Sequence, residues 1–577
     1  MVKLTDCLLV LDLEAFCHSE WKENDMDSSI PHKVCISYSF LLPSCLCTLM
    51  TIMCRLRFVC LLLFIFRSLV SSEELPTLQS GPDADLYWSR RDQILVEESR
   101  ISLGGQLNFG YGEREANDVL MAAKWAEIDR GFRDPSSFLP ARNFLSVADE
   151  IRRSPTFRMI QAMPKGAALH VHSHAFVSTD FVFGNITFRD NLYICRPSDG
   201  SFQFEFRRSG GSEVTCASSN GWELLAELRA NASIVKDVNT RIRDAMIVPD
   251  PATAYCDINA SWTAFRNVSK TIRSLLVYKP VLEDYVYQGL TELYRDNVFY
   301  IELRITFQNL YDLDGNVYGP LDIVRLYKNT TDRFIRDHPD FVGARLIFAP
   351  RRSGSEAREQ IKQYFVTFAA VQKEFPDFVV GFDTVGQEDT GHPLTWLLKE
   401  LRTIAPSTRF FFHAGETNWN GLSTDGNLID AVLLNTTRIG HGFAVSKHPR
   451  VLELVVEREV AIEVNPISNQ VLCFCGDMRN HPASFLFARN YPVVVSSDDP
   501  AIWGASGLSY DFYEAFVGIM SRSADIRALK QLAINSIKYS AMPNEEKNRA
   551  YAIWQDKWAK FITDLGQRSG APIITQT

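Results

Sequence analysis

Short runs of apolar residues alternate with helix-compatible stretches over most of the chain. Such runs are typical of strands buried on both faces of a parallel sheet. Eight of them are predicted as strands: Ala167–His172, Val298–Ile305, Ala344–Ala349, Phe378–Asp383, Phe410–His413, Arg438–His441, Ala461–Asn465 and Pro492–Ser496. From the second strand onward, each is followed by a segment with helical spacing. Eight strands alternating with helices predict an α/β fold, a (β/α)8 barrel of the TIM type.

Two regions depart from this alternation. Residues 73–160 have mostly helical spacing and are predicted as an N-terminal helical region in front of a barrel that spans residues 161–577. The first connection runs from Ser173 to about Asn297 and is far longer than a βα loop requires. We therefore predict a long insertion after the first strand, at about residues 185–245.

The first 72 residues differ in composition from the rest, because seven of the twelve cysteines lie among the first 60. The basic start at Met53, an apolar run over Phe58–Phe66 and small residues up to Ser72 form the pattern of a secretory signal peptide. We predict a signal peptide at residues 53–72, and residues 1–52 as an upstream extension or alternative start. The apolar run is shorter than the roughly 20 residues that a membrane span needs.

A signal anchor is the alternative if translation begins at Met1, because a second apolar stretch lies at Phe40–Met53. Pro43, Arg55 and Arg57 interrupt the combined segment. No later stretch of the sequence is a membrane candidate, so we expect no stable span in the mature chain.

Glycosylation sequons favour secretion. The acceptor pattern occurs at Asn185, Asn231, Asn259, Asn267, Asn329 and Asn435. Cys195 and Cys216 lie among the first of these, and in an oxidising compartment they either close a loop or remain thiols; their spacing does not decide. We predict a secreted, extracellular protein.

Composition narrows the function. In 577 residues, 46% are hydrophobic and 22% charged, which is typical of an ordered globular protein. The formal net charge is −9, and no long basic run is present, so nucleic acid is not an expected partner.

Histidine and aspartate gather at the carboxyl ends of the predicted strands, where this fold places catalysis. His170 and His172 end the first strand on one face, and His413, His441 and Asp498 end the fifth, sixth and eighth. Each alone has a plausible core role. Three imidazoles and one carboxylate drawn from this set are the ligands that one zinc ion takes.

Three further groups lie close to that predicted metal site. Glu416 is placed to move a proton, and His441 and Asp499 flank the expected position of a water activated by the metal. The alternative for Asp499 is a helix N-cap before Pro500.

Four motifs together closely resemble the adenosine deaminases: Met163-Pro-Lys-Gly-Ala-Ala-Leu-His-Val-His172, His-Ala-Gly-Glu416, Arg-Ile-Gly-His-Gly442 and Ser-Ser-Asp-Asp-Pro500. Three more resemble the secreted branch of that family, the adenosine deaminase-related growth factors: Gly381-Phe-Asp-Thr-Val-Gly386, Asn-Pro-Ile-Ser-Asn469 and Gly507-Leu-Ser-Tyr-Asp-Phe-Tyr513. The resemblance covers about residues 80–565.

The resemblance implies roles for individual residues. One zinc ion per subunit would be held by His170, His172, His413 and Asp498. Glu416 would protonate the purine ring nitrogen, while His441 and Asp499 would position and activate the water. Gly386 and Trp262 would contact the nucleoside. The family further implies a homodimer through the N-terminal helices and a disulfide matching Cys195–Cys216.

Two positions depart from the pattern of the secreted branch. Ser173 stands where a carboxylate is expected to hold the ribose, and Arg351 replaces a histidine on the substrate side. Loss of one hydrogen bond to substrate costs up to about tenfold in affinity. Neither change touches the metal ligands or Glu416.

The leading hypothesis is an extracellular zinc-dependent adenosine deaminase that converts adenosine and 2′-deoxyadenosine to inosine and ammonia. Growth-factor activity would follow from adenosine depletion, with a cell-surface receptor or glycan as a further partner. The alternative is a secreted signalling or nucleoside-binding protein with weak catalysis. A two-metal amidohydrolase is disfavoured because the fourth strand ends without lysine, and a cytidine-deaminase type because its Pro-Cys-X-X-Cys motif is absent.

Overall fold

The computed structural model describes residues 84–197, 201–208, 215–218, 220–250, 257–353 and 358–567. The predicted upstream extension and signal peptide lie outside the described residues. The chain divides into two compact units, Met1–Tyr87 and Trp88–Thr577. The fold and the site below belong to the second unit.

Eight parallel strands form the centre of this unit. Four pair in the order β1 (Gly166–His172), β5 (Val298–Ile305), β8 (Gly343–Phe348) and β9 (Val379–Phe382). The other four pair in the order β10 (His413–Ala414), β11 (Arg438–His441), β12 (Ala461–Val464) and β13 (Val493–Val495). All eight predicted strands are confirmed; the fifth is shorter and begins later than expected.

Single parallel bridges connect the two sheets at both edges. Phe382 pairs with Phe410 at one edge, and Val171 pairs with Asp498 at the other. The His172 amide donates to the Asp498 carbonyl, and the Asp498 amide donates to the His170 carbonyl, at 2.9 and 3.0 Å. The strands therefore close into the predicted barrel, and closure itself draws the ends of the first and last strands together.

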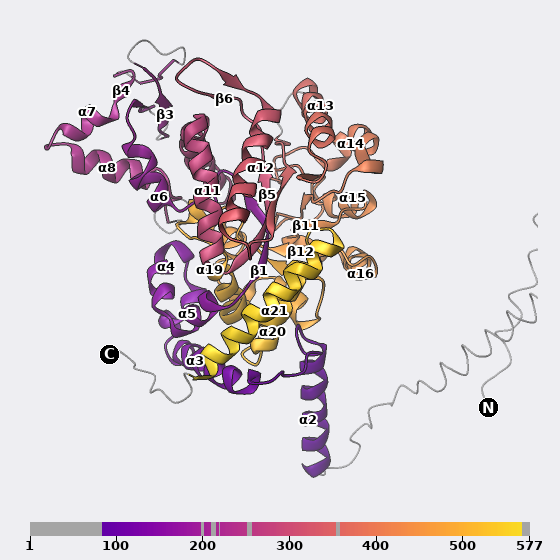
Figure 1. Ribbon diagram of the computed structural model, residues 1–577. Coiled ribbons are helices and arrows are strands. Elements are labelled where there is room, and N and C mark those ends of the chain that lie inside the picture. Colours follow the sequence, from indigo (N-terminus) through magenta and orange to yellow (C-terminus); the bar gives the residue numbers. More distant parts are fainter. Residues whose placement is uncertain are drawn as a thin grey trace, which may run out of the picture. The chain divides into compact units, whose positions relative to one another are not determined.

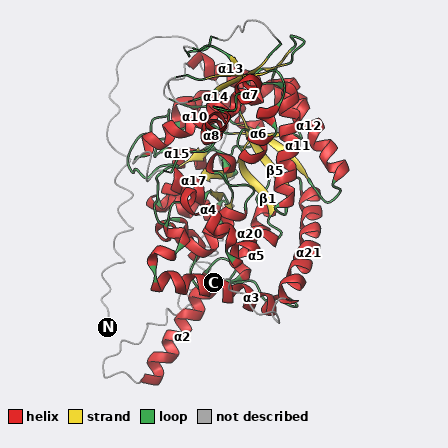
Figure 2. Cartoon of the chain, turned by 90° about the vertical axis from the view of Figure 1, so that its left-hand side faces the viewer, coloured by secondary structure: helices red, strands yellow, loops and turns green. Residues whose placement is uncertain are grey.

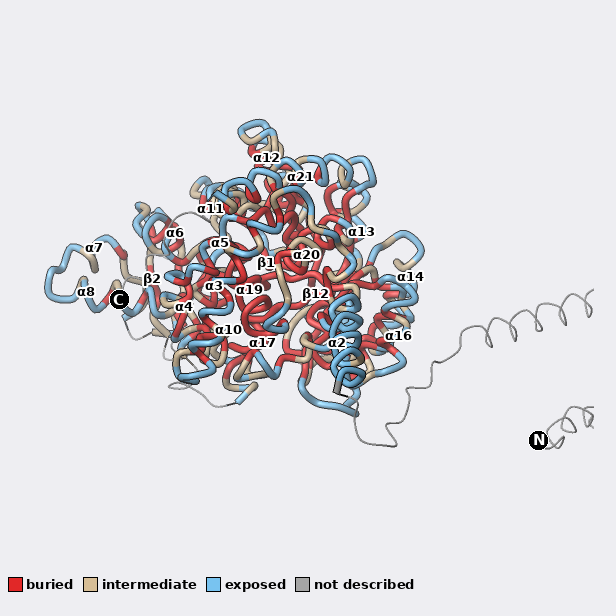
Figure 3. Tube along the Cα trace, turned by 90° about the horizontal axis from the view of Figure 1, so that it is seen from below, coloured by how far each residue is buried: buried red, intermediate tan, exposed pale blue. Residues whose placement is uncertain are grey.

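Helices surround the strands in chain order, with buried strands at the centre and exposed helical faces outside (Figures 1 and 3). They are α12 (Pro320–Asp337), α13 (Arg358–Glu374), α14 (Leu398–Ile404), α15 (Asn427–Leu433), α16 (Pro449–Glu457), α17 (Pro466–Val471), α18 (Ala483–Ala488), α19 (Ser509–Tyr513), α20 (Ile526–Lys538) and α21 (Asn544–Gly566). In α12, buried Ile323, Tyr327 and Phe334 recur at helical spacing and face the barrel.

The connection between β1 and β5 holds a small substructure (Figure 2). It comprises α6 (Thr179–Gly184), β2 (Leu192–Cys195), β3 (Gln203–Phe206), β4 (Glu223–Leu224), α7 (Leu225–Ala230), α8 (Val235–Asp244), α10 (Ile258–Leu276) and α11 (Lys279–Arg295). The three strands are antiparallel in the order β3-β2-β4. Cys195 and Cys216 form a disulfide, which confirms the pairing that the resemblance implies.

Four helices precede the barrel: α2 (Ala84–Ile101), α3 (Glu113–Arg133), α4 (Phe144–Arg153) and α5 (Pro155–Ala162). In α3, Glu113 accepts hydrogen bonds from Trp558 and Lys530, which tie it to the C-terminal helices. In α2, by contrast, Trp88, Leu95 and Val96 are about half exposed. Within the described residues, no helix combines the length and apolar character that a membrane crossing requires.

Candidate active site

A cavity of about 110 Å³ opens at the carboxyl ends of the strands. Residues at or just after the carboxyl ends of strands line one side, here called the strand-end wall: His172, His413, Glu416, His441, Asp498 and Asp499. Helix α10 and the loops after β8 and β9 line the other side, here called the connection wall: Trp262, Phe265, Arg266, Arg273, Arg351 and Gly386. Strand ends and a long connection therefore meet over one cavity.

The predicted metal ligands converge at the strand-end wall. Asp498 Oδ1 lies 3.0 Å from His172 Nε2 and 3.3 Å from His170 Nε2. The ligand atoms of His170, His413, His441 and Asp498 all lie within 4.8 Å of one another, and all four residues are buried. His170 Nε2 is buried without a hydrogen bond among the described residues. With His172 Nε2 beside Asp498, the predicted set His170, His172, His413 and Asp498 offers the nitrogen and oxygen donors that a small divalent cation such as zinc takes.

Two of these imidazoles are oriented by carboxylates. His170 Nδ1 lies 2.7 Å from Glu463 Oε2, and His413 Nδ1 lies 2.7 Å from Asp383 Oδ2. A carboxylate only accepts hydrogen bonds, so each Nδ1 carries the proton and each Nε2 lone pair faces the other ligands. These are the tautomers that a metal site requires.

Buried arginines keep the two orienting carboxylates ionised. Arg304 donates to Asp383 at 2.7 Å and to Glu463 at 2.6 Å, and Arg438 donates to Glu463 at 2.5 Å. Burial alone would raise the pKa of Glu463, but Arg304 and Arg438 hold it well below its usual range. Arg438 also pairs with Glu302. A closed network of charges thus lies beneath the cluster.

Sequence reasoning missed this network. Glu302 and Arg304 lie within β5, Arg438 begins β11, and Glu463 lies within β12. A charged residue inside a short apolar strand was the available signal, because such a residue is buried only when it is paired.

The three carboxyl groups of the strand-end wall differ in protonation. Burial, the charge of Asp498 and then that of Glu388 raise the pKa of Glu416 well above its usual range. Burial and the charge of Asp498 likewise raise the pKa of Asp499. The pKa of Asp498 is shifted in the opposite direction: the neighbouring imidazoles of His170 and His172 outweigh its burial and hold its pKa well below the usual range. The raised pKa of Glu416 favours its protonated form, so a carboxyl group able to donate a proton lies beside the ionised Asp498.

Unusual backbone conformations position the side chains of the strand-end wall. His441 and Asp498 have φ of 61° and 58°, a left-handed conformation that costs a non-glycine residue free energy and is common at functional sites. Gly440 allows the close approach of His170, whose Cε1 would lie 3.0 Å from a Cβ there. Asp499 precedes the short helix Pro500–Trp503, but its side chain makes no capping hydrogen bond, so the N-cap explanation is not supported.

The connection wall holds the residues predicted to contact substrate, with one exception. Trp262, Gly386 and Arg351 line the cavity. Ser173 instead lines a smaller neighbouring cavity of about 40 Å³, together with Tyr327. At Gly386 the φ is 112° and a Cβ would meet nothing within 4 Å, so this position borders open space.

His174 was not predicted and lies between the two cavities, lining both. Its Nδ1 lies 3.0 Å from an Arg273 nitrogen, and its Nε2 lies 3.6 Å from Asp499 Oδ1. Burial, followed by the charge of Arg273, lowers the pKa of His174 well below its usual range. The spacing His170-Val-His-Ser-His174 was the available signal, since alternation along a strand brings every second residue to one face.

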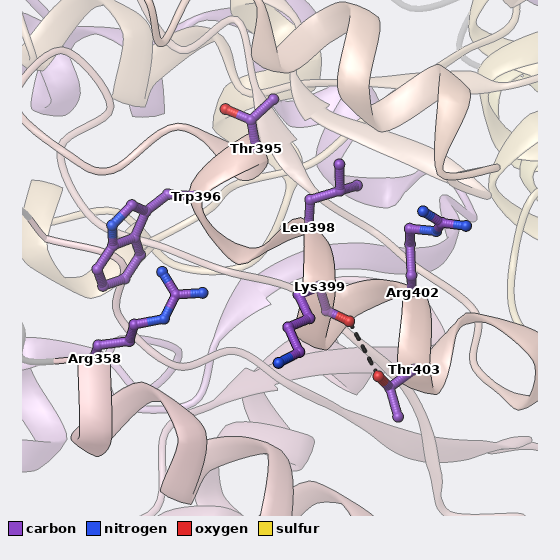
Figure 4. Close-up of a pocket in the computed structure, with 7 residues that line it drawn as sticks. All are labelled: Arg358, Thr395, Trp396, Leu398, Lys399, Arg402 and Thr403. Atoms are coloured by element: carbon purple, nitrogen blue, oxygen red, sulfur yellow. Dashed lines mark hydrogen bonds between the residues drawn. The ribbon is translucent and has the colours of Figure 1, made fainter.

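A further cavity, open to the surface, lies at α13 and α14 (Figure 4). Arg358, Lys399 and Arg402 surround it, and the Arg358 guanidinium lies over the Trp396 ring at 5.2 Å. Among the described residues, no carboxyl or imidazole group lines it, in contrast to the acid–base groups of the first cavity.

The chain matches two family models. "Adenosine deaminase" matches residues 243–553, and "Adenosine/AMP deaminase N-terminal" matches residues 56–160.

Several curated proteins are similar over most of their length. "Adenosine deaminase" of Phlebotomus duboscqi is 45% identical over 85% of this chain and 95% of its own. "Adenosine deaminase" of Lutzomyia longipalpis is 44% identical over 82% and 93%. "Adenosine deaminase 2" of Homo sapiens is 40% identical over 83% and 94%. The resemblance drawn from the motifs is thereby confirmed: this chain belongs to the adenosine deaminase family and is a hydrolase of that family.

Proposed function

We propose that this protein is a zinc-dependent adenosine deaminase that hydrolyses adenosine and 2′-deoxyadenosine to inosine and ammonia. The observation that carries the proposal is the strand-end wall, where the Nε2 lone pairs of His170 and His413 and the Asp498 carboxylate adjoin Glu416, whose raised pKa favours the protonated acid. Similarity to proteins named adenosine deaminase supports the choice of substrate.

His170, His172, His413 and Asp498 would hold the zinc ion. A zinc ion bound there supplies the Lewis acidity that makes water a nucleophile at neutral pH. His441 also offers a ring nitrogen to this cluster; its Nδ1, however, faces the Asn469 side-chain nitrogen at 3.1 Å rather than a carboxylate. His172 Nε2 lies closer to Asp498, at 3.0 Å against 3.7 Å for His441 Nε2, which supports His172 as the third imidazole ligand.

The remaining strand-end groups move protons. Glu416 gives its proton to the purine ring nitrogen next to the carbon under attack. His441 and Asp499 hold the attacking water, and the amino group leaves as ammonia after it gains a proton. Guanosine carries oxygen in place of this amino group, so we expect it not to react.

On the connection wall, Trp262 and Gly386 would contact the base, and Arg351 and Ser173 would face the sugar side. Replacement of the expected carboxylate by Ser173 and of the expected histidine by Arg351 bears on affinity. Neither replacement alters the groups that carry the chemistry.

We further propose that the protein acts outside the cell. The Cys195–Cys216 disulfide supports an oxidising compartment. The sequon asparagines Asn185, Asn231, Asn259, Asn329 and Asn435 are exposed and Asn267 is half-buried. Signalling through adenosine depletion, with a cell-surface receptor or glycan as partner, would follow from activity there.

A homodimer through residues 73–160 completes the proposal. Exposed apolar side chains on α2 support it: Trp88, Ile94, Leu95, Val96 and Ile101 are each between 43% and 55% exposed. Contiguous exposed apolar surface is typical of a protein–protein interface.

The test is ammonia release from adenosine by the secreted, zinc-loaded protein. We expect Glu416→Gln to lower kcat on the order of 10³-fold, and chelation to abolish turnover until zinc is restored. His448→Gln is the matched control, because His448 pairs with Asp425 away from the cavity. Absence of turnover in folded, zinc-loaded wild-type protein would contradict the proposal and favour a nucleoside-binding or signalling role.

A further inference from the structure

His441 differs from the carboxylate-bound histidines in what faces its Nδ1. The Asn469 side-chain nitrogen lies 3.1 Å from this atom, whereas carboxylates face His170 and His413. A side-chain amide offers either an oxygen or an NH₂ group, so its orientation decides whether Nδ1 donates or accepts. The other contacts of Asn469 fix that orientation.

The orientation of the Asn469 amide is determined, through His481, by the backbone amide of Ala483. The Ala483 N–H donates to His481 Nδ1 at 3.1 Å, and a backbone N–H has no other role than donor. Burial lowers the pKa of His481 to about 3, so its ring is neutral at working pH. With Nδ1 accepting, the single ring proton lies on Nε2.

The proton on His481 Nε2 then determines the direction of the next two hydrogen bonds, to Asn469 and to His441. His481 Nε2 lies 3.0 Å from Asn469 Oδ1, which accepts from it. The Asn469 NH₂ group therefore points at His441 and donates to Nδ1. His441 in turn carries its proton on Nε2, which lies 3.6 Å from Glu416 Oε1 and 3.7 Å from Asp498 Oδ2.

The residues of this hydrogen-bond series are buried or belong to a helix. Asn469 lies in α17 and is fully buried. Its backbone carbonyl accepts a hydrogen bond from the Phe474 amide at 2.9 Å. His481 is 2% exposed, and its ring packs edge-on against Phe443 at 5.1 Å between centroids. Ala483 begins α18, so the first donor belongs to a helix terminus. The hydrogen bonds to His481 Nδ1 and Asn469 Oδ1 therefore set the orientation of both side chains.

We propose that His481 and Asn469 are positioning residues that keep His441 in the tautomer protonated at Nε2. His441 then donates a hydrogen bond inside the cavity, and it has no Nε2 lone pair to offer a metal. The inference deepens the proposed deaminase activity and rests on it for the catalytic consequence. The tautomer itself follows from the contacts alone.

Asn469→Asp is the sharpest variant. Aspartate has the same shape and can accept from both His481 Nε2 and His441 Nδ1, so packing and hydrogen-bond count are preserved. It reverses the His441 tautomer, however, and we expect kcat to fall on the order of 10²-fold or more while KM for adenosine stays nearly constant. A merely structural role predicts that this variant is tolerated.

His481 supplies a matched pair. His481→Gln keeps an N–H donor toward Asn469 Oδ1 and should hold kcat within about twofold of wild type. His481→Leu removes the donor and frees the Asn469 amide to reverse, so kcat should fall on the order of tenfold. Equal kcat in the two variants would overturn the proposal.

The direct readout is ¹⁵N NMR of the full, zinc-loaded chain labelled at histidine, with His441 identified by its absence in His441→Gln. We expect the Nε2–H tautomer in wild type and His481→Gln, and an Nδ1–H or doubly protonated ring in Asn469→Asp. An Nδ1–H tautomer in wild type, or an Asn469→Asp variant with unchanged kcat, sinks the inference. The spectrum does not depend on turnover, so it separates a failure of this inference from a failure of the proposed activity.

Discussion

The two walls of the cavity are built in different ways. At the strand-end wall, two of the proposed metal ligands rest on buried partners: His170 on Glu463 and His413 on Asp383, with both carboxylates held by Arg304. On the connection wall, the lining comes from α10 and two loops, outside the strands. The proposed metal ligands are thus fixed by the barrel, whereas the residues proposed to face the substrate lie on α10 and on loops outside the strands.

The charges of the two walls differ as well. Arg304 and Arg438 beneath the strand-end wall form ion pairs with three carboxylates. None of the connection-wall arginines, Arg266, Arg273 and Arg351, forms an ion pair within the described part of the chain. Arg273 instead hydrogen-bonds His174 and Ser269. The comparison predicts that substitutions beneath the strand-end wall have large effects on stability and metal binding. Substitutions on the connection wall should have moderate effects on substrate affinity.

Arg304→Leu should have the largest effect. It leaves Asp383 and Glu463 buried with less compensation, and breaking a buried pair in this way costs about 3–5 kcal/mol. We expect that loss in the free energy of unfolding measured by denaturant titration, together with loss of bound metal. Arg450→Leu is the control: this exposed arginine pairs with Glu453 at the surface, where such pairs contribute below about 1 kcal/mol. Similar losses in both variants would contradict the distinction between a fixed wall and the surface.

The pH dependence should come from the strand-end wall. Glu416 must be protonated to act as the acid, and burial and Asp498 raise its pKa. The active form is therefore present below that raised pKa and is lost as the pH rises through it. We expect kcat/KM to fall by about tenfold per pH unit on the alkaline side. An alkaline limit at the ordinary glutamate pKa, near 4.3, would show that the cavity does not stabilise the protonated acid.

Arg273→Met should act on affinity. Its removal takes away the partner of His174 Nδ1 and a cation that lines the cavity. We expect KM for adenosine to rise about tenfold, with a much smaller change in kcat, as loss of a hydrogen-bonded charged group predicts. Steady-state kinetics beside Arg241→Met, an exposed arginine of α8, checks this. A larger loss in kcat than in KM would place Arg273 with the strand-end groups.

The features that the sequence predicts are the strands and the residues at their ends, and the features it does not predict depend on contacts between distant segments. All eight strands were predictable from their short apolar runs, and the histidines and aspartate at four strand ends indicated at which end of the barrel the site lies. Glu463, Arg304 and Asn469 were not, since their roles depend on which strands and helices become neighbours after closure. Ser173 and His174 show the limit of spacing: alternation does not tell which of two adjoining cavities a residue faces once the strand has ended.

Ser173→Asp gives the smallest expected effect and couples the two cavities. Ser173 lines the smaller cavity, which shares His174 and Arg273 with the first. A carboxylate there would adjoin the unpaired Arg273, and through it we expect KM for adenosine to fall by up to about tenfold with kcat unchanged. The effect should vanish in an Arg273→Met background, as a double-mutant cycle would show. A gain that survives in that background would mean that the carboxylate reaches the sugar directly, as the resemblance implies.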